Sequence, residues 1–293
     1  MLAEQVAPQV SLQEAYAHCR HIALGRRENF PVASWFLPKP LRPHLYAIYA
    51  YCRGVDDIGD EASGDRLALL EEWEAELKRA YLGGATDPRF IALAHTIKRF
   101  EIPPQPFDAL IDANRRDQRT TRYETFDELL DYCSHSANPV GHLILYVFGC
   151  RDTELQALAD FTCTALQLAN MWQDVSVDAA KGRIYIPRED MSAFGVDGAD
   201  IFERRFTPEF QRLMQFQVER TRDHFRRGLP LIGRASGHLR VDLRAFTLGG
   251  LAALRSVEDR GYDVLSGRAS ISRLDRALIL PNALSPLPIK IPK

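Results

Sequence analysis

Apolar residues recur three and four positions apart along most of the chain, a spacing that places them on one face of a helix. Period-two alternation, which marks a half-buried strand, is almost absent from the sequence. The pattern therefore predicts an all-α protein, with helices expected over residues 12–24, 43–55, 67–81, 126–148, 154–177, 210–227 and 241–265.

Prolines and glycines separate the expected helices. None of the breaks is long enough to link two domains, and no segment repeats at a fixed period, so a single domain over residues 1–293 is expected. Residues 280–293 contain four prolines and are expected to form an irregular tail. Its leucines Leu280, Leu284 and Leu287 are expected to pack against the domain, with membrane contact as the alternative. The breaks are expected at residues 38–40 (PKP), 83–84 (GG), 102–104 (IPP) and 228–230 (GLP).

The composition is that of a soluble globular protein, with 46% hydrophobic and 26% charged residues among 293. Basic residues number 37 and acidic residues 39, which leaves a net charge of −2 and no overall positive field of the kind that nucleic acid attracts. No nucleic-acid partner is expected. Arginines do gather in residues 115–122 and 220–227, and the second group is interpreted as a solvated helix face.

The cysteines and the longest apolar stretches indicate the cellular compartment in which the protein is expected. Five widely spaced cysteines without a CxxC pair favour neither a disulfide framework nor a zinc site, and they suit a reducing cytoplasm. The longest apolar candidate, residues 143–148, is far shorter than the roughly 18 residues of a membrane span. A cytoplasmic protein is expected, with peripheral contact at the inner membrane face left open.

A first acidic cluster, residues 56–61 (DDIGDE), follows an apolar helix face at the C-terminal end of the same expected helix. Asp56 and Asp60 are four residues apart, as are Asp57 and Glu61, so two carboxylate pairs flank a glycine. The helix dipole is negative at this end and adds to the repulsion, which a bound cation would relieve. A metal site and a solvated acidic helix end both fit this cluster alone.

A second cluster places Asn170, Asp174 and Asp178 at i, i+4 and i+8 on a helix whose other faces are strongly apolar. Buried carboxylates without partners cost several kcal/mol, and a divalent ion shared between two such helices removes that cost. Mg²⁺ characteristically takes one or two carboxylates together with waters and phosphate oxygens. Two clusters of this kind predict Mg²⁺, two or three ions, and a diphosphate ligand.

The flanking residues supply donors suited to a diphosphate. Arg53 precedes Asp56 by three residues, on the same side of the helix, where its guanidinium could bind phosphate in a bidentate fork. Gln167 stands in the same relation to Asn170. Residues 181–187 (KGRIYIP) follow the second cluster as a glycine break and a short extended stretch, either a basic flap or a simple loop.

These motifs resemble the squalene and phytoene synthase family of head-to-head isoprenoid synthases over nearly the whole chain. The resemblance is carried by residues 46–57 (YAIYAYCRGVDD), 167–174 (QLANMWQD), 182–187 (GRIYIP) and 261–265 (GYDVL). It implies a single-domain helical bundle with a central active-site cavity, in which prenyl diphosphates are converted.

Within the family, residues 28–35 (ENFPVASW) and 136–141 (SANPVG) look like the bacterial hopanoid-pathway branch called HpnC. That resemblance implies conversion of presqualene diphosphate to hydroxysqualene with release of diphosphate. Carried over by position, Asp56, Asp60, Asn170, Asp174 and Asp178 would hold Mg²⁺, and Arg53, Gln167, Arg183 and Tyr262 would contact diphosphate. Further candidates are Asp57 and Glu61 as metal ligands and Phe30 and Asn29 as substrate contacts. The candidate catalytic set is Asp56, Asp60, Asn170, Asp174, Tyr49 and Asn138.

The chain departs from its relatives at several of these places. Gln173 stands where most phytoene synthases have arginine, Arg26 and Asn29 stand where a relative carries histidine and serine, and Asn138 with Pro139 replaces small residues. These departures lie around the expected diphosphate and prenyl sites, so they favour a specialised reaction over a two-substrate condensation.

Ionising a prenyl diphosphate leaves a carbocation, which an apolar cavity lined with aromatic faces would stabilise. Phe30, Tyr49, Tyr132 and Phe161 are candidates for that wall, with ordinary core aromatics as the alternative. No glycine-rich nicotinamide fingerprint is present, and NADPH is not expected if water captures the cation. Asn138 is the hypothesised guide for that water.

Two other functions stay open at this point. One is head-to-head condensation of two prenyl diphosphates, farnesyl to presqualene diphosphate or squalene, or geranylgeranyl to phytoene. The other is a non-catalytic lipid-binding or assembly factor of the same fold, which the retention of both acidic motifs argues against. Transient contacts with a membrane or with neighbouring pathway enzymes are compatible with either reaction.

Overall fold

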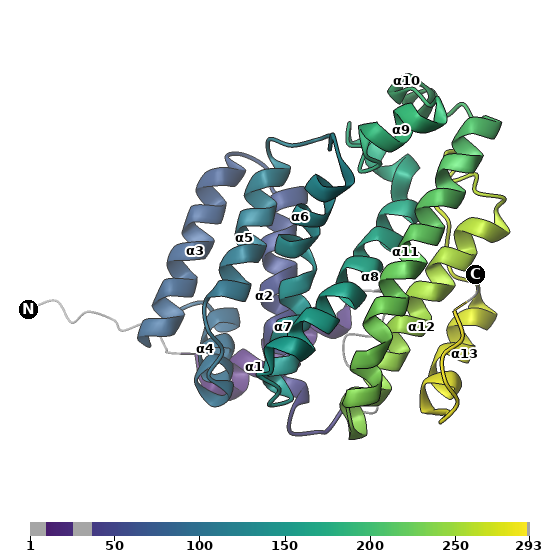
Figure 1. The fold of residues 1–293 in the computed structure, drawn as a ribbon. Coiled ribbons are helices and arrows are strands. Elements are labelled where there is room, and N and C mark those ends of the chain that lie inside the picture. The colour runs from purple at the N-terminus through teal and green to yellow at the C-terminus, as the bar shows by residue number, and fades with distance from the viewer. Residues whose placement is uncertain (1–9, 26–36, 292–293) are drawn as a thin grey trace, which may run out of the picture. The chain divides into compact units, whose positions relative to one another are not determined.

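Helices form all the regular structure in the part of the chain that is described, as the apolar spacing predicts. The computed structural model describes residues 10–25 and 37–291, and within them no strand occurs (Figure 1). The all-α fold class is confirmed. The chain divides into two compact units, unit 1 of Met1–Gln118 with Leu143–Cys150 and unit 2 of Arg119–His142 with Arg151–Lys293. The expectation of a single domain stays a prediction.

Unit 1 is built around α2, which packs against the four other helices of this unit. Tyr51 of α2 is fully buried, and its hydroxyl donates a hydrogen bond to the carbonyl oxygen of Phe107 at 3.0 Å. Its ring contacts the rings of Trp73, Phe90 and Phe107. Burying such an aromatic contributes about 2–3 kcal/mol. The helices are α1 (Leu12–Gly25), α2 (Arg42–Asp60), α3 (Arg66–Leu82), α4 (Pro88–Phe100) and α5 (Gln105–Asp117).

Unit 2 is built around the long helix α8, which packs chiefly on α11 and α12. Trp172 of α8 is fully buried and donates its indole N–H to Thr221 of α11 at 2.8 Å. A Cβ on Gly228 of α11 would lie 2.3 Å from Oγ1 of Thr162, so this glycine allows the two helices to approach closely. The helices are α6 (Phe126–Ser136), α8 (Thr153–Ala180), α9 (Arg188–Phe194), α10 (Gly198–Phe202), α11 (Pro208–Arg234), α12 (Gly237–Asp259) and α13 (Arg273–Leu284), and the unit boundary falls within α7 (Asn138–Val147).

Several expected helix boundaries were wrong, each for an identifiable reason. The helix expected over residues 126–148 is split at Ala137 between α6 and α7, because Pro139 has no N–H to donate to the preceding turn and its ring crowds the carbonyl four residues earlier. The break expected at residues 228–230 does not occur: α11 continues through Pro230, and its packing on α8 outweighs the hydrogen bond that a proline forfeits. In residues 241–265 the helix ends at Asp259.

The C-terminal expectation was also wrong in part. Residues 273–284 form α13, which passes through Pro281, so the irregular tail begins only at Ser285. The tail leucines do not pack against the domain: Leu280, Leu284 and Leu287 are all exposed. Helices α4, α5, α9 and α10 were missing from the prediction.

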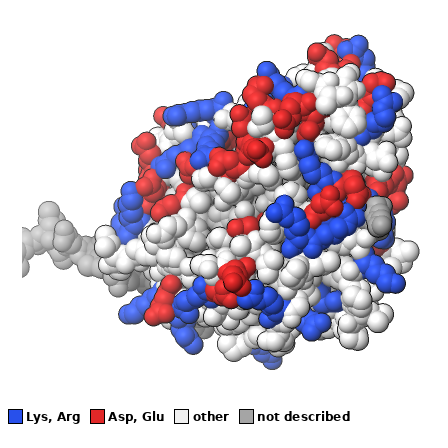
Figure 2. Space-filling model, in the orientation of Figure 1, with Lys and Arg blue, Asp and Glu red and all other residues white. Residues whose placement is uncertain are grey.

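The surface carries charges of both signs, and Figure 2 shows Lys and Arg side chains interleaved with Asp and Glu over the visible face. Across residues 10–25 and 37–291, no helix has the length and apolar character needed to cross a bilayer.

Candidate functional site

The first acidic cluster lies on the last turn of α2 in unit 1, where the sequence placed it. Asp56 and Asp60 are exposed, and Oδ1 of Asp56 accepts a hydrogen bond from Nδ2 of Asn114 at 3.3 Å. Although the Asp56 carboxylate reaches solvent, protein crowds it closely, and this desolvation raises its pKa to about 6 against the lowering effects of Asn114 and Arg53. Its neighbours Asp60 and Asp57 raise the pKa further. Such a carboxylate gains from a nearby cation.

Arg66 supplies a positive group at this helix end. Its guanidinium donates to the carbonyl oxygens of Gly59 at 2.9 Å, Asp60 at 3.2 Å and Ala62 at 2.9 Å. These are carbonyls at the negative end of the α2 dipole, so the arginine offsets part of the repulsion that the acidic cluster adds there. Sequence reasoning missed Arg66, although it follows the cluster by only five residues.

Asp57 and Glu61, the second carboxylate pair, both contact Arg53. Nη2 of Arg53 lies 2.6 Å from Oδ1 of Asp57 and 3.0 Å from Oε1 of Glu61. The expected i, i+4 pairs therefore have different surroundings, because Asp57 and Glu61 are both engaged by an arginine of the same helix, whereas Asp56 accepts from Asn114 of α5. The metal-binding role of all four carboxylates stays a prediction.

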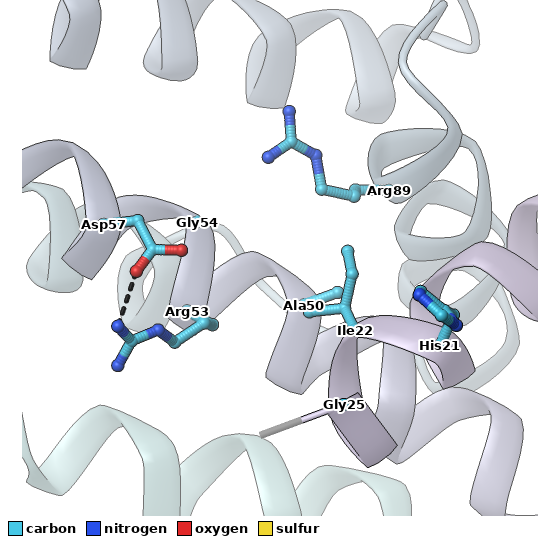
Figure 3. A pocket seen from close by; sticks show the side chains of 8 residues that line it. All are labelled: His21, Ile22, Gly25, Ala50, Arg53, Gly54, Asp57 and Arg89. Carbon is cyan, nitrogen blue, oxygen red and sulfur yellow. Dashed lines mark ion pairs between the residues drawn. The ribbon is translucent and has the colours of Figure 1, made fainter. Parts of the chain in front are cut away.

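A basic pocket of about 250 Å³ lies beside this cluster within unit 1. Figure 3 shows Arg53, Arg89, His21 and Asp57 around it, with the dashed ion pair between Arg53 and Asp57. Arg89 is fixed by Asp87 at 2.6 Å and by stacking over the ring of Trp73 at 4.5 Å. Basic side chains outnumber the carboxylate in this pocket, which suits an anion.

His21 and Arg89 are pocket residues that sequence reasoning missed, because they come from α1 and α4 and carry no motif signal. Tyr49, an expected catalytic residue, is partly buried and packs against the core cluster that α1, α2 and α4 share. Phe30 and Asn29 lie outside the described residues.

The second cluster forms a polar row along α8 in unit 2. Gln167, Asn170, Asp174 and Asp178 are all partly exposed, while the residues between them are mostly buried. The buried Oδ1 of Asn170 has no hydrogen-bond partner among the described residues. A buried amide oxygen without a donor is costly unless something else binds it.

Asp174 is held by Arg268, which lies outside every motif. Nη2 of Arg268 donates to Oδ2 of Asp174 at 3.1 Å, and its Nε pairs with Oδ1. Burial raises the pKa of the Asp174 carboxyl, while Arg268 and Lys181 lower it. No sequence signal links positions 174 and 268.

The segment after α8 is an ordered strip held by the polypeptide before α6. Ile184 and Arg188 donate their backbone N–H groups to the carbonyls of Thr121 and Tyr123, at 3.1 and 3.0 Å. The strip lies along the second cluster, because Arg183 and Tyr185 line a small depression together with Asp178. Whether residues 181–187 act as a basic flap or as a simple loop stays a prediction.

Three tyrosines gather beside this strip. The rings of Tyr123, Tyr132 and Tyr185 lie 5.6 to 5.9 Å apart, centroid to centroid. Tyr132 is one of the expected wall residues, and its two partners were not recognised from the sequence. Phe161, another expected wall residue, instead lies under the guanidinium of Arg227 at 3.9 Å.

The remaining expected residues take buried or strained positions in unit 2. Asn138 is buried at the start of α7, where its Oδ1 accepts a hydrogen bond from Thr164 of α8 at 3.0 Å. Gln173 is buried and donates to Ser256 of α12 at 2.9 Å. Tyr262 has a φ of +68°, a conformation that side chains rarely adopt, which is consistent with a functional turn.

The donors present suit Mg²⁺ by chemistry, since the first cluster offers carboxylate oxygens and the row on α8 offers carboxylate and amide oxygens, including the buried Oδ1 of Asn170. Within the described ranges no three His, Cys, Asp or Glu side chains form a ready metal cage. Mg²⁺ usually takes only one or two carboxylates and completes its shell with water and phosphate, so rows of this kind fit it.

Comparisons with known proteins give the family. The squalene/phytoene synthase family matches residues 25–275. A 15-cis-phytoene synthase of Synechococcus elongatus is 32% identical over 94% of each chain. The crystal structure of squalene synthase HpnC from Alicyclobacillus acidocaldarius is 46% identical, with a TM-score of 0.82 over 87% of this chain and 97% of that one. A dehydrosqualene synthase with a bound ligand is 25% identical, with a TM-score of 0.85 over 93% and 96%. The chain belongs to the squalene/phytoene synthase family.

Proposed function

We propose that this protein ionises presqualene diphosphate and captures the cation with water, giving hydroxysqualene and diphosphate. The observation that carries the proposal is the 46% identity with squalene synthase HpnC over 87% of the chain, against 32% with the phytoene synthase of Synechococcus elongatus. The HpnC-like residues 136–141 and the buried Gln173 support the same branch.

In this reaction the bond from the cyclopropylcarbinyl carbon to the diphosphate oxygen breaks, and both electrons leave with the diphosphate. The leaving group carries about three negative charges, which fixed cationic donors stabilise. In unit 1, Arg53 and Arg89 of the pocket are proposed to bind phosphate. In unit 2, Arg183 and Tyr262 are the proposed phosphate contacts. Each arginine offers a planar fork that matches phosphate oxygens.

Mg²⁺ is the proposed cofactor. In unit 1 the proposed ligands are Asp56 and Asp60 of α2, and in unit 2 they are Asn170, Asp174 and Asp178 of α8, with Gln167 as a further proposed contact of the second row. When bound, Mg²⁺ would neutralise charge on the departing diphosphate oxygens. The unpartnered Oδ1 of Asn170 supports this assignment, because it is a buried acceptor that lacks a donor among the described residues.

The cation then rearranges and meets water: a new carbon–oxygen bond forms from a water lone pair, and that water gives up one proton. The balance requires no reductant, so NADPH is not needed for this product. Asn138, fixed by Thr164, is proposed to orient the water. The faces of Tyr123, Tyr132 and Tyr185 are proposed to stabilise the cation, because aromatic quadrupoles attract positive charge without reacting.

The test supplies one substrate at a time. The protein is incubated with presqualene diphosphate alone and with farnesyl diphosphate alone, each with Mg²⁺ and without NADPH, and the products are identified by mass spectrometry. Hydroxysqualene and diphosphate are expected from the first incubation and nothing from the second. Conversion of farnesyl diphosphate into a C30 diphosphate would overturn the proposal.

A second candidate, head-to-head condensation, is favoured by one observation: curated relatives such as the Synechococcus and maize enzymes are phytoene synthases, the latter 32% identical over 94% of this chain. Incubation with geranylgeranyl diphosphate completes the comparison. A protein that releases no diphosphate from any of the three substrates in the presence of Mg²⁺ would instead be a non-catalytic relative.

A further inference from the structure

One arginine of the group at residues 115–122 contacts the strip that follows α8. Nη1 of Arg122 donates to the carbonyl oxygen of Gly182 at 2.9 Å and to that of Thr121 at 2.7 Å. The guanidinium carbon lies 4.9 Å from the ring centroid of Phe202 on α10, a helix that packs on α8 (Figure 1). Arg122 therefore joins the polypeptide before α6 to the strip and to α10, all within unit 2.

Gly182 forms the turn at which the chain leaves α8. Its φ is +81°, a value at which a side chain would be strained. The backbone N–H groups of Lys181 and Arg183 both donate to the carbonyl oxygen of Asp178 at 2.9 Å, so the chain folds back on the last turn of the helix. The Gly182 carbonyl belongs to the same peptide unit as the N–H of Arg183. Asp178 thus holds one side of this unit and Arg122 holds the other.

The peptide unit on the other side of Arg183 is fixed as well. Ile184 donates its backbone N–H to the carbonyl oxygen of Thr121 at 3.1 Å, and its side chain is buried. Because each peptide unit is planar, fixing both units that flank a Cα atom fixes the direction of its Cα–Cβ bond. Residues 121–122 thereby aim Arg183, whose side chain lines the same depression as Asp178 of the polar row.

We propose that Arg122 is a positioning residue for diphosphate binding, which holds the Gly182 carbonyl so that the guanidinium of Arg183 faces the ligand of the α8 row. The proposal rests on the proposed function, in which Arg183 contacts phosphate. Arg122 acts through Arg183, because its own Nη1 is occupied by two backbone carbonyls. A guanidinium fork binds phosphate in a narrow range of orientations, so binding weakens when the peptide unit is released, although Arg183 itself is intact.

Isothermal titration calorimetry of the full chain with inorganic diphosphate and Mg²⁺ measures this binding without a prenyl group, so the result does not depend on which prenyl diphosphate reacts. Arg183→Ala is expected to raise the Kd for diphosphate about tenfold or more, because a charge-assisted contact is lost. Arg122→Ala, which leaves Arg183 in place, is expected to raise it about fivefold.

Two further variants separate positioning from a general structural role. The double variant Arg122→Ala/Arg183→Ala should bind no more weakly than Arg183→Ala, because the effect of Arg122 disappears when the side chain that it positions is absent. Arg122→Lys should recover most of the affinity, since an ammonium group can donate to both carbonyls.

Arg119→Ala is the matched control, because it removes an exposed arginine of the same group. Its Kd is expected to equal that of wild type, and thermal melting verifies that every variant is folded. If Arg122→Ala is unfolded, Arg122→Gln takes its place, since it removes the charge and keeps an amide, and it is expected to raise the Kd by a similar factor.

Wild-type affinity in Arg122→Ala, together with weakened binding in Arg183→Ala, would overturn the positioning role and leave the Arg183 contact of the proposed function standing. Wild-type affinity in Arg183→Ala would remove that contact and the positioning role with it. Additive losses in the double variant, or an equal loss in Arg119→Ala, would show that Arg122 does not act through Arg183 and would also overturn the proposal. Absence of diphosphate binding by wild type would contradict the proposed function and the positioning role together.

Discussion

Arg268 holds the carboxylate of Asp174 across 94 positions of the sequence, with Nη2 3.1 Å from Oδ2 and with Nε paired to Oδ1. Burial raises the pKa of the Asp174 carboxyl, and the positive charge of Arg268 acts in the opposite direction. A residue that the sequence marks as a metal ligand is thus maintained as an anion by an arginine that the sequence does not mark.

Replacing Asp174 with Asn is expected to separate activity from stability. The change removes a proposed Mg²⁺ ligand, so Mg²⁺-dependent diphosphate release should fall about 100-fold or more. The thermal midpoint should move by no more than about 3 °C, because two effects oppose each other. The variant loses the ion pair with the half-exposed Arg268, but it also loses the cost of desolvating the carboxylate. The measurements are a diphosphate-release assay over a Mg²⁺ series and thermal melting.

Asp160→Asn is the matched control, since Asp160 is on the same helix outside the row and its amide can still accept from His142. Its diphosphate release is expected to stay near that of wild type. An Asp174→Asn variant with wild-type release and wild-type Mg²⁺ dependence would contradict the ligand assignment.

Gly59→Ala is expected to disturb Asp56 through Asn114. A Cβ at position 59 would lie 2.0 Å from Oδ1 of Asn114 and 2.9 Å from its Cγ, so the amide must move and its hydrogen bond to Asp56 must weaken. The free energy of unfolding should fall by about 1–3 kcal/mol. Chemical denaturation measures it.

The control is Gly84→Ala, where the new Cβ has no neighbour within 4 Å. The double variant Gly59→Ala/Asn114→Ala should recover part of the loss, because the two substitutions share one contact. Strict additivity of the two single changes would show that the clash is not the cause.

Asn138→Ala tests the proposed water-orienting residue. Thr164 would lose its buried acceptor, at a cost of about 1 kcal/mol in the free energy of unfolding. Proton loss from the cation should then compete better with water capture, so the share of alcohol among the products should fall. Product analysis by mass spectrometry measures it.

Thr164→Val provides the comparison, because it removes the same hydrogen bond and leaves the Asn138 amide in place. Its product ratio is expected to shift less than that of Asn138→Ala. An unaltered rate and unaltered alcohol product in Asn138→Ala would exclude the water-orienting role.

The buried side chain of His224 is expected to lower the free energy of unfolding in acid. Burial, followed by the charges of Arg227 and Arg220, lowers its pKa from 6.5 to about 4. The contribution of His224 to stability is complete above pH 6.5, where both states are neutral. Between pH 6.5 and 4 the unfolded chain takes up a proton that the folded chain refuses, so stability is lost as the pH falls.

The free energy of unfolding differs between pH 7 and pH 4, and His224→Gln should reduce this difference by up to about 3 kcal/mol. The reason is that each unit by which the pKa differs between the folded and unfolded states corresponds to about 1.4 kcal/mol. Denaturant titrations at several pH values give this difference. His18→Gln, the same substitution at an exposed histidine, is the control. Parallel stability curves for His224→Gln and wild type would refute the assignment.

The sequence by itself determined the helical class, the position of both acidic rows and the family. These depend on local spacing: apolar residues every three or four positions specify a helix, and carboxylates four apart share a face of it. For the same reason the C-terminal end of α2 and the row on α8 were predicted at the correct places.

Only the tertiary structure decided which side chains complete those rows. Arg268 at Asp174, Asn114 at Asp56 and Arg89 in the pocket come from distant segments, and no periodicity relates them to their partners. Packing also overrode local signals: α11 continues through Pro230 because its contact with α8 compensates the lost hydrogen bond. The exposure of Leu280 and Leu284 in α13 was likewise decided by the tertiary structure, since amphipathic spacing specifies that a helix has an apolar face but not what covers it.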